Sequence, residues 1–207
     1  MKVTFKIPPI FQPFTPSSDA ESTRAEALAR MADWTTQTAQ SELDELADTY
    51  SQTAALLDSA GVFYAATCLT EFHGELSSGT LTMASTPLSY NDARTATAGI
   101  AEILDATPSR ERYITVLPMP CGQVTLAIDQ SAALRIPAQF SRTGEDIPIN
   151  VAQLQAFIPV PAEKIPGAQE LITVTFSTPS THHWEEYCAI LAELLRSLDF
   201  GPAMTSA

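Results

Sequence analysis

The chain has 207 residues, of which 45% are apolar, and its formal net charge is −13. This length and composition predict one domain with a sizeable core, and the charge argues against partners with phosphate backbones or anionic lipid surfaces. No run approaches the roughly 18 apolar residues of a membrane span, and the N-terminus lacks the apolar segment of a signal peptide. We therefore expect a cytoplasmic protein that binds neither nucleic acid nor membrane.

The N-terminal segment, 1–18, combines four prolines with several large apolar side chains. Proline fixes an extended backbone, while the apolar side chains need cover from solvent. The pattern predicts an extended arm packed on the domain, with an edge strand over Val3–Ile7. A proline-rich ligand for another protein is the alternative interpretation.

Two helices are predicted next, over Asp19–Trp34 and Thr38–Ser59, because apolar residues recur at helical spacing in both segments. Residues 19–58 carry nine acidic residues against Arg24 and Arg30, a net charge of −7. Such an acidic face is either simply solvated or a docking surface for a basic partner.

The segments Val62–Phe72 and Thr80–Leu88 are rich in β-branched and aromatic residues and predict two strands, joined by a hairpin loop over residues 72–79. Ser89–Asp92 then resembles a capping box. It predicts a third helix, which ends before Pro108 because proline disfavours helical geometry in the preceding residue.

The second half of the chain is mainly β in pattern. Alternation predicts strands at Arg112–Met119, Gln123–Asp129, Ala133–Arg142, Ile149–Val160 and Leu171–Ser177. After Pro179 the period changes to that of a helix, over Ser180–Leu198. Its apolar residues share one arc of the helix, which therefore needs a sheet face to cover.

The expected order is two helices, two strands, one helix, five strands and a last helix. Consecutive strands joined by short turns favour antiparallel pairing. We therefore expect the α+β class, with an antiparallel sheet of six to seven strands and helices packed on its faces. The expected organisation is an arm over 1–18, a single domain over 19–200 and a disordered tail over 201–207.

Motifs for several common chemistries are missing from the sequence. It has no glycine-rich nucleotide motif, no G-x-S-x-G elbow, no H-E-x-x-H and no C-x-x-C. Cys68, Cys121 and Cys188 are an odd number of widely spaced residues, as is typical of reduced structural thiols. We therefore expect no cofactor, no metal and no catalytic residue.

Two weak candidates for chemistry lie in turns. Glu71, His73 and Glu75 alternate around the hairpin loop, and a metal could use this ligand spacing, although a solvated loop is the simpler interpretation. Cys121 is a candidate for an exposed reactive thiol. A reactive thiol needs a nearby cation or helix N-terminus, and the nearest basic residue in the sequence is Arg112.

A third candidate is a binding surface at the start of the last helix, where His182 and His183 precede Trp184. Together with Phe157, these residues are our candidates for contact with a ligand or partner. The alternative is that Trp184 only anchors the core.

Three segments of the chain resemble the PsbP-like fold group: Gln153–Pro161, Leu171–Pro179 and Trp184–Phe200. A strand, a small polar turn and an aromatic-led helix ending in Ser-x-x-Phe are typical of this group. It includes the photosystem II extrinsic protein, a Ran-binding nuclear import factor, and DcrB-type and LpqN-type proteins. The chain looks closest to uncharacterised cytoplasmic proteins of actinobacteria.

The resemblance implies an antiparallel sheet between helices and a binding or scaffold role. The absence of a lipobox cysteine and the two acidic helices depart from the group's pattern.

The leading hypothesis is a non-enzymatic protein-binding adaptor or scaffold with a basic protein partner. Two alternatives stay open. One is a carrier of a small apolar ligand, held between the sheet and the last helix near Trp184 and Phe157. The other is a thiol- or metal-dependent enzyme that uses Cys121 or His73.

Overall fold

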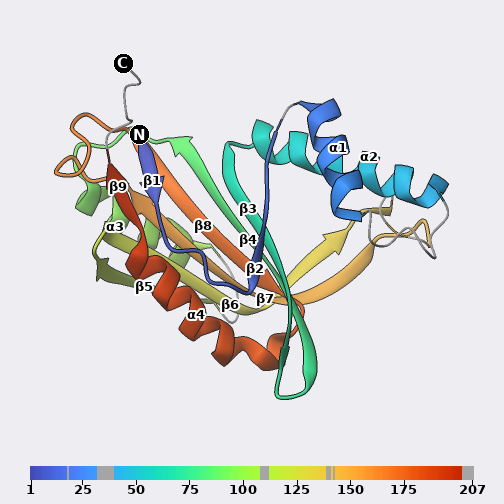
Figure 1. The fold of residues 1–207 in the computed structure, drawn as a ribbon. Coiled ribbons are helices and arrows are strands. Elements are labelled where there is room, and N and C mark those ends of the chain that lie inside the picture. Colours follow the sequence, from blue (N-terminus) through green and yellow to red (C-terminus); the bar gives the residue numbers. More distant parts are fainter. Residues whose placement is uncertain (18, 32–39, 108–111, 139–140, 142, 202–207) are drawn as a thin grey trace.

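A computed structural model describes residues 1–17, 19–31, 40–107, 112–138, 141 and 143–201. In these residues the chain forms one large antiparallel sheet with helices on both faces and a small two-stranded ribbon beside it (Figure 1). The α+β class, the antiparallel sheet and the expected number of strands are confirmed.

The main sheet contains seven strands in the spatial order β2-β3-β4-β8-β7-β6-β5, and every neighbouring pair is antiparallel. The strands are β2 (Phe11–Phe14), β3 (Val62–Phe72), β4 (Glu75–Pro87), β5 (Arg112–Met119), β6 (Gly122–Ile136), β7 (Ile147–Pro159) and β8 (Glu170–Thr178). Strand β8 is the centre of this order, because it joins the sheet half made by β2–β4 to the half made by β5–β7.

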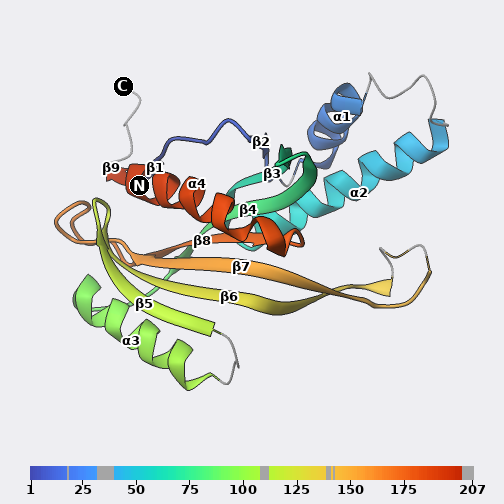
Figure 2. The same cartoon turned by 90° about the horizontal axis from the view of Figure 1, so that it is seen from below.

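Helices cover opposite faces of the sheet (Figure 2). The helical elements are α1 (Ala20–Met31), α2 (Gln40–Ser59), α3 (Ala93–Ala106), the 3₁₀ turn η3 (Thr181–His183) and α4 (Trp184–Ser197). Helix α3 covers one face, where the hydroxyl of Thr125 on β6 donates a 3.0 Å hydrogen bond to the carbonyl of Thr97 on α3. Helix α4 lies on the other face and buries Tyr187 and Leu191 there. None of the described helices combines the length and apolarity needed to cross a membrane.

The core between β8 and α4 is centred on Phe176, which is fully buried. Its ring centroid lies 4.7 Å from that of Tyr187, 6.5 Å from that of Trp184 and 6.1 Å from that of Phe11. Gly79 on the neighbouring strand leaves room for this ring, because a Cβ atom there would lie 2.7 Å from the ring carbons. The core-facing side chains of β8 and the apolar side chains of α4 therefore pack together in one cluster of aromatic rings.

The N-terminal arm forms strands in two places. Strand β1 (Lys2–Thr4) pairs with β9 (Asp199–Gly201) at the other end of the chain. The predicted edge strand over Val3–Ile7 is therefore present only at Val3 and Thr4, in the two-stranded ribbon, and the edge of the main sheet is formed by β2. Phe11 of β2 is 4% exposed. The arm thus supplies an aromatic anchor to the core, although Ile7 of the same arm remains 44% exposed.

Strand β6 replaces two predicted strands. The segments Gln123–Asp129 and Ala133–Arg142 were expected to be separate, but β6 runs from the first into the second and ends at Ile136, with a register shift between Asp129 and Ala132. The Ser131 amide donates a 3.0 Å hydrogen bond to the Asp129 carboxylate. The residues between the two predicted segments therefore form an irregularity within one strand, as a β-bulge does, and the strand stays in one sheet.

The cap of α3 also differs from the prediction. Asp92 is the N-cap residue, and its carboxylate accepts a 2.9 Å hydrogen bond from the Thr95 amide. Hydrogen bonds from Thr95 lower the pKa of this carboxyl. The expected capping box starting at Ser89 is therefore shifted by three residues.

Parts of several predictions lie outside the described residues. These are the end of the first helix at 32–34, the start of the second at 38–39, the end of one strand at 139, 140 and 142, and most of the expected tail, at 202–207. Gly201, the first residue of that tail, belongs to β9.

Candidate functional site

The turn between β3 and β4 is shorter than the sequence predicts. Phe72 pairs with Glu75, so the turn consists only of His73 and Gly74. Both have positive φ, 54° and 84°, as in a type I′ hairpin turn. The predicted loop over 72–79 is therefore wrong: from Glu75 onward these residues belong to β4, which fixes the backbone that carries the Glu75 side chain.

This hairpin tip lies against the start of α4, and all three histidines of the chain meet there. We call the group the histidine cluster: His73, Glu75, His182, His183 and Glu186. His73 Nε2 lies 2.7 Å from Glu186 Oε1, and His182 Nε2 lies 3.2 Å from Glu75 Oε2. The rings of His182 and His183 have centroids 4.0 Å apart.

His183 is the buried member of the cluster, with 3% of its surface exposed. Its ring packs edge-on against Phe72, with centroids 5.4 Å apart, and its Nδ1 atom is buried without a hydrogen-bond partner. The Oε2 atom of Glu186 is in the same condition. Buried polar atoms are nearly always satisfied in folded proteins, because an unmade hydrogen bond is costly.

The charge on Glu186 is favoured by its surroundings. Its own backbone amide and then His73 hydrogen-bond to the carboxylate and lower its pKa, and the nearby His183 acts in the same direction. The cluster therefore holds an ionised carboxylate beside two histidines.

The structure groups the candidate residues differently from the sequence prediction. Glu75 joins His182 and His183, whereas Glu71 is not among the potential metal ligands of the described residues. Trp184 is 7% exposed and packs in the core beside Phe176. The adjacent histidines and the hairpin acids were both visible as separate sequence signals, but nothing in the sequence indicated that they meet.

Phe157 lies apart from the other three candidates. It is paired in register with Thr125, which bonds to α3 on the sheet face away from α4. The alternation of β7 already implied this orientation, because Ala156 and Ile158 face the core and Phe157 must face the opposite way. The expectation that Phe157 and Trp184 line one cavity therefore disagrees with the structure.

Cys121 is not an exposed thiol, and that expectation is wrong. It is fully buried, and burial raises the pKa of its thiol to about 11. The charges that act on it come from Asp199, just after α4, and from Lys164. The histidines lie at the opposite end of α4, a helix of 14 residues that is about 21 Å long. Cys121 and these histidines therefore cannot form a nucleophile–base pair.

Alkylation with iodoacetamide at pH 8 should leave Cys121 unmodified in the native protein. Its pKa of about 11, against an ordinary 9.0, reduces the thiolate population about 100-fold, and burial excludes the reagent. Cys188, which is partly exposed, should react first and serves as the internal control. Peptide mapping by mass spectrometry measures both rates. Reaction of Cys121 at the rate of free cysteine would restore the thiol-enzyme hypothesis.

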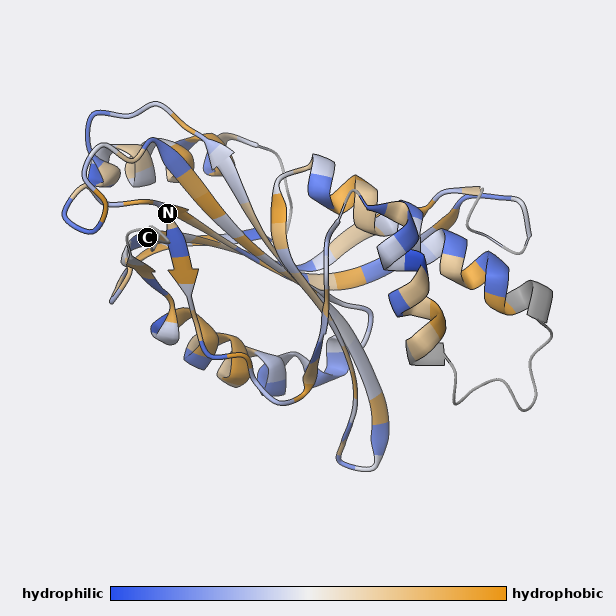
Figure 3. Cartoon of the chain, turned by 45° about the horizontal axis from the view of Figure 1, so that its top comes forward, coloured by the Kyte–Doolittle hydropathy of each residue, from blue (hydrophilic) through white to orange (hydrophobic). Residues whose placement is uncertain are grey.

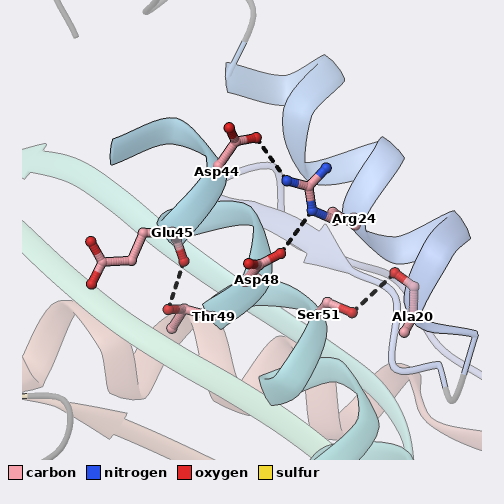
Figure 4. Close-up of polar contacts among 7 residues, drawn as sticks. All are labelled: Ala20, Arg24, Asp44, Glu45, Asp48, Thr49 and Ser51. Carbon is pink, nitrogen blue, oxygen red and sulfur yellow. Dashed lines mark hydrogen bonds and ion pairs between the residues drawn. The ribbon is translucent and has the colours of Figure 1, made fainter. Parts of the chain in front are cut away.

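The acidic helix pair, α1 and α2, is a second candidate surface. It lies to one side of the sheet, beyond β3, and hydrophilic residues recur along both helices (Figure 3). Arg24 bridges the two helices, because its guanidinium contacts Asp44 and Asp48 at 2.7 Å each (Figure 4). The Ser51 hydroxyl also donates a 3.0 Å hydrogen bond to the Ala20 carbonyl, so the helices run antiparallel.

The outer face of α2 combines acidic and apolar residues. Glu45 points away from the Arg24 bridge (Figure 4). Leu46 and Leu56 are 46% and 63% exposed, and α2 contains no basic residue at any position. Arg24 pairs with Asp44 and Asp48 within the helix pair, whereas Glu21 and Glu45 are exposed outside this bridge.

Comparison with known proteins gives no match: no family model, no curated protein and no solved structure is significantly similar to this chain. The resemblance to the PsbP-like group stays a prediction. The sites above are therefore interpreted from their geometry alone.

Proposed function

We propose that this protein is a non-enzymatic adaptor that binds a basic, amphipathic protein segment through the acidic helix pair. The observation that carries the proposal is the exposed surface of α2, on which Glu45 is exposed together with Leu46 and, further along the helix, Leu56. Acidic groups steer a basic partner, and exposed leucines supply apolar contact area. The resemblance to the PsbP-like group supports the same binding or scaffold role.

The attachment of the helix pair to the sheet supports a docking role. The ring of Phe14 on edge strand β2 lies 4.3 Å from that of Tyr50 on α2, and the Ser17 amide donates a 3.3 Å hydrogen bond to the Ala54 carbonyl. These contacts hold the inner side of α2 against the arm. The outer side of α2 is left for a partner.

The test uses a fluorescent amphipathic peptide of lysine and leucine, with binding measured by anisotropy. The double variant Glu21→Gln/Glu45→Gln removes two exposed charges without touching the Arg24 bridge. We expect its affinity to fall about threefold to tenfold, and wild-type affinity to fall as salt rises from 50 to 500 mM, because salt screens exposed charges.

The matched control is Glu102→Gln/Glu193→Gln, which removes the same charge from exposed positions on α3 and α4. Its affinity should equal that of the wild type. Equal losses in both double variants would mean that the peptide responds only to net charge. That result, or binding unchanged by salt, would refute the proposal.

A further inference from the structure

We propose that Glu75, His182 and His183 form a binding site for a divalent transition metal ion, of which Zn²⁺ is the representative probe. Each of these side chains offers one ligand atom, and the three atoms lie within 4.8 Å of one another. Two imidazole nitrogens and one carboxylate oxygen suit zinc and its neighbours, whereas calcium and magnesium prefer oxygen ligands alone. Three protein ligands leave a fourth position for water, as in open zinc sites.

The distances are close to those that coordination requires. Ligand atoms about 2.1 Å from a tetrahedral zinc ion lie about 3.4 Å apart, and His182 Nε2 is already 3.2 Å from Glu75 Oε2. The side chains of His182 and Glu75 are 57% and 68% exposed, so both can adjust without disturbing the core. His183 is held by the ring of Phe72. One fixed ligand and two adjustable ones can close around an ion.

The buried His183 ring gives independent support. Its Nδ1 atom has no hydrogen-bond partner, although only 3% of the residue is exposed to solvent. A metal ion bound to this nitrogen would supply the missing partner. No hydrogen bond from the described residues reaches this nitrogen.

The backbone under the site is well fixed. The Thr178 hydroxyl donates a 2.6 Å hydrogen bond to the Ser78 carbonyl, and the Ser78 amide donates one of 3.2 Å to the Ser180 hydroxyl. The Ser180 amide in turn donates to the Thr178 hydroxyl at 3.0 Å. These bonds tie the segment before His182 to the strand that carries Glu75. The carboxylate and the two imidazoles, far apart in sequence, are therefore held in register by β4 and β8.

The neighbouring charges favour a cation. Glu186 is ionised, pairs with His73 at 2.7 Å and lies near His183. Glu71 and Glu185 are exposed on the same hairpin and helix. Carboxylates around the site raise the local concentration of cations, and a bound ion would link the hairpin tip to the start of α4.

The test is titration of the metal-free full chain with Zn²⁺ by calorimetry, and with Co²⁺ by visible absorption. We expect one ion per chain, an intense tetrahedral cobalt spectrum and no binding of Ca²⁺. Glu75→Gln and His182→Asn, both at exposed positions, should each weaken zinc binding at least tenfold. His183→Asn should do the same if it folds.

The matched controls are Glu71→Gln and Glu185→Gln, which remove the same charges beside the site without removing a ligand. They should bind zinc within about twofold of the wild type. Absence of zinc binding would overturn the proposal. Binding unchanged in Glu75→Gln and His182→Asn, or lost only in His73→Asn, would overturn it as well, because the ion would then sit elsewhere.

Discussion

Phe176→Ala should lower the free energy of unfolding by about 3–5 kcal/mol, as large-to-small substitutions of buried aromatic residues do. The ring is fully buried between β8 and α4 and contacts the rings of Phe11, Trp184 and Tyr187. Its loss would leave a cavity bounded by the arm, the sheet and the last helix. The arm, the sheet and the last helix are distant in sequence and packed separately, so a local shift of one of them cannot close the cavity.

Urea unfolding followed by circular dichroism measures this loss as a lower transition midpoint with an unchanged slope. Phe63→Ala is the matched control, because it makes the same change on β3 at a side chain that is 40% exposed. We expect the control to lose at most half as much stability. Equal losses in the two variants would show that Phe176 does not hold the core together.

Alkaline pH should destabilise the protein, with Cys121 contributing a loss of about 2 kcal/mol by pH 11. Burial raises the pKa of this thiol from 9.0 to about 11. Between these values the unfolded chain has lost the proton and the folded chain has kept it, so raising the pH favours unfolding. The contribution is fully present below pH 9 and is lost as the pH rises through 11, at about 1.4 kcal/mol per pKa unit.

Burial also raises the pKa of Tyr187 to about 12, which adds a loss of the same sign above pH 10. Urea unfolding of wild type and Cys121→Ala under reducing conditions at pH 8, 9, 10 and 11 separates the two contributions. The variant should lose about 2 kcal/mol less than the wild type over this range. Cys188→Ala is the control and should follow the wild type more closely, because Cys188 is only partly buried. Parallel curves for wild type and Cys121→Ala would contradict the buried thiol.

Prediction succeeded where a structural property is local. Alternation in β8 identifies which side chains face the core, and the residues concerned are all fully buried. Most of the apolar arc of α4 is buried as well, at Trp184, Tyr187, Leu191, Leu194 and Leu195. Both patterns arise from the fixed geometry of one strand or one helix, so they can be read without knowing the rest of the fold.

Prediction failed where partners are distant in sequence. The sequence predicts a strand that includes Val3, but nothing local indicates that Lys2–Thr4 pairs with Asp199–Gly201 at the other end of the chain. The long strand β6 was divided in the prediction because its alternation is interrupted where the register shifts, between Asp129 and Ala132. The turn at His73 was overestimated in length, since positive φ at a histidine is uncommon.

The α+β class, the amphipathic last helix and the acidic charge of the helix pair could be predicted from the sequence, because composition and periodicity are properties of single segments. The meeting of Glu75 with His182 and His183, the position of α4 on the sheet face away from Phe157, and the burial of Cys121 could be seen only in the folded chain. These outcomes depend on the register between β4 and β8 and on which face each helix covers. Register and packing are set by many weak contacts between distant residues, and no single segment encodes them.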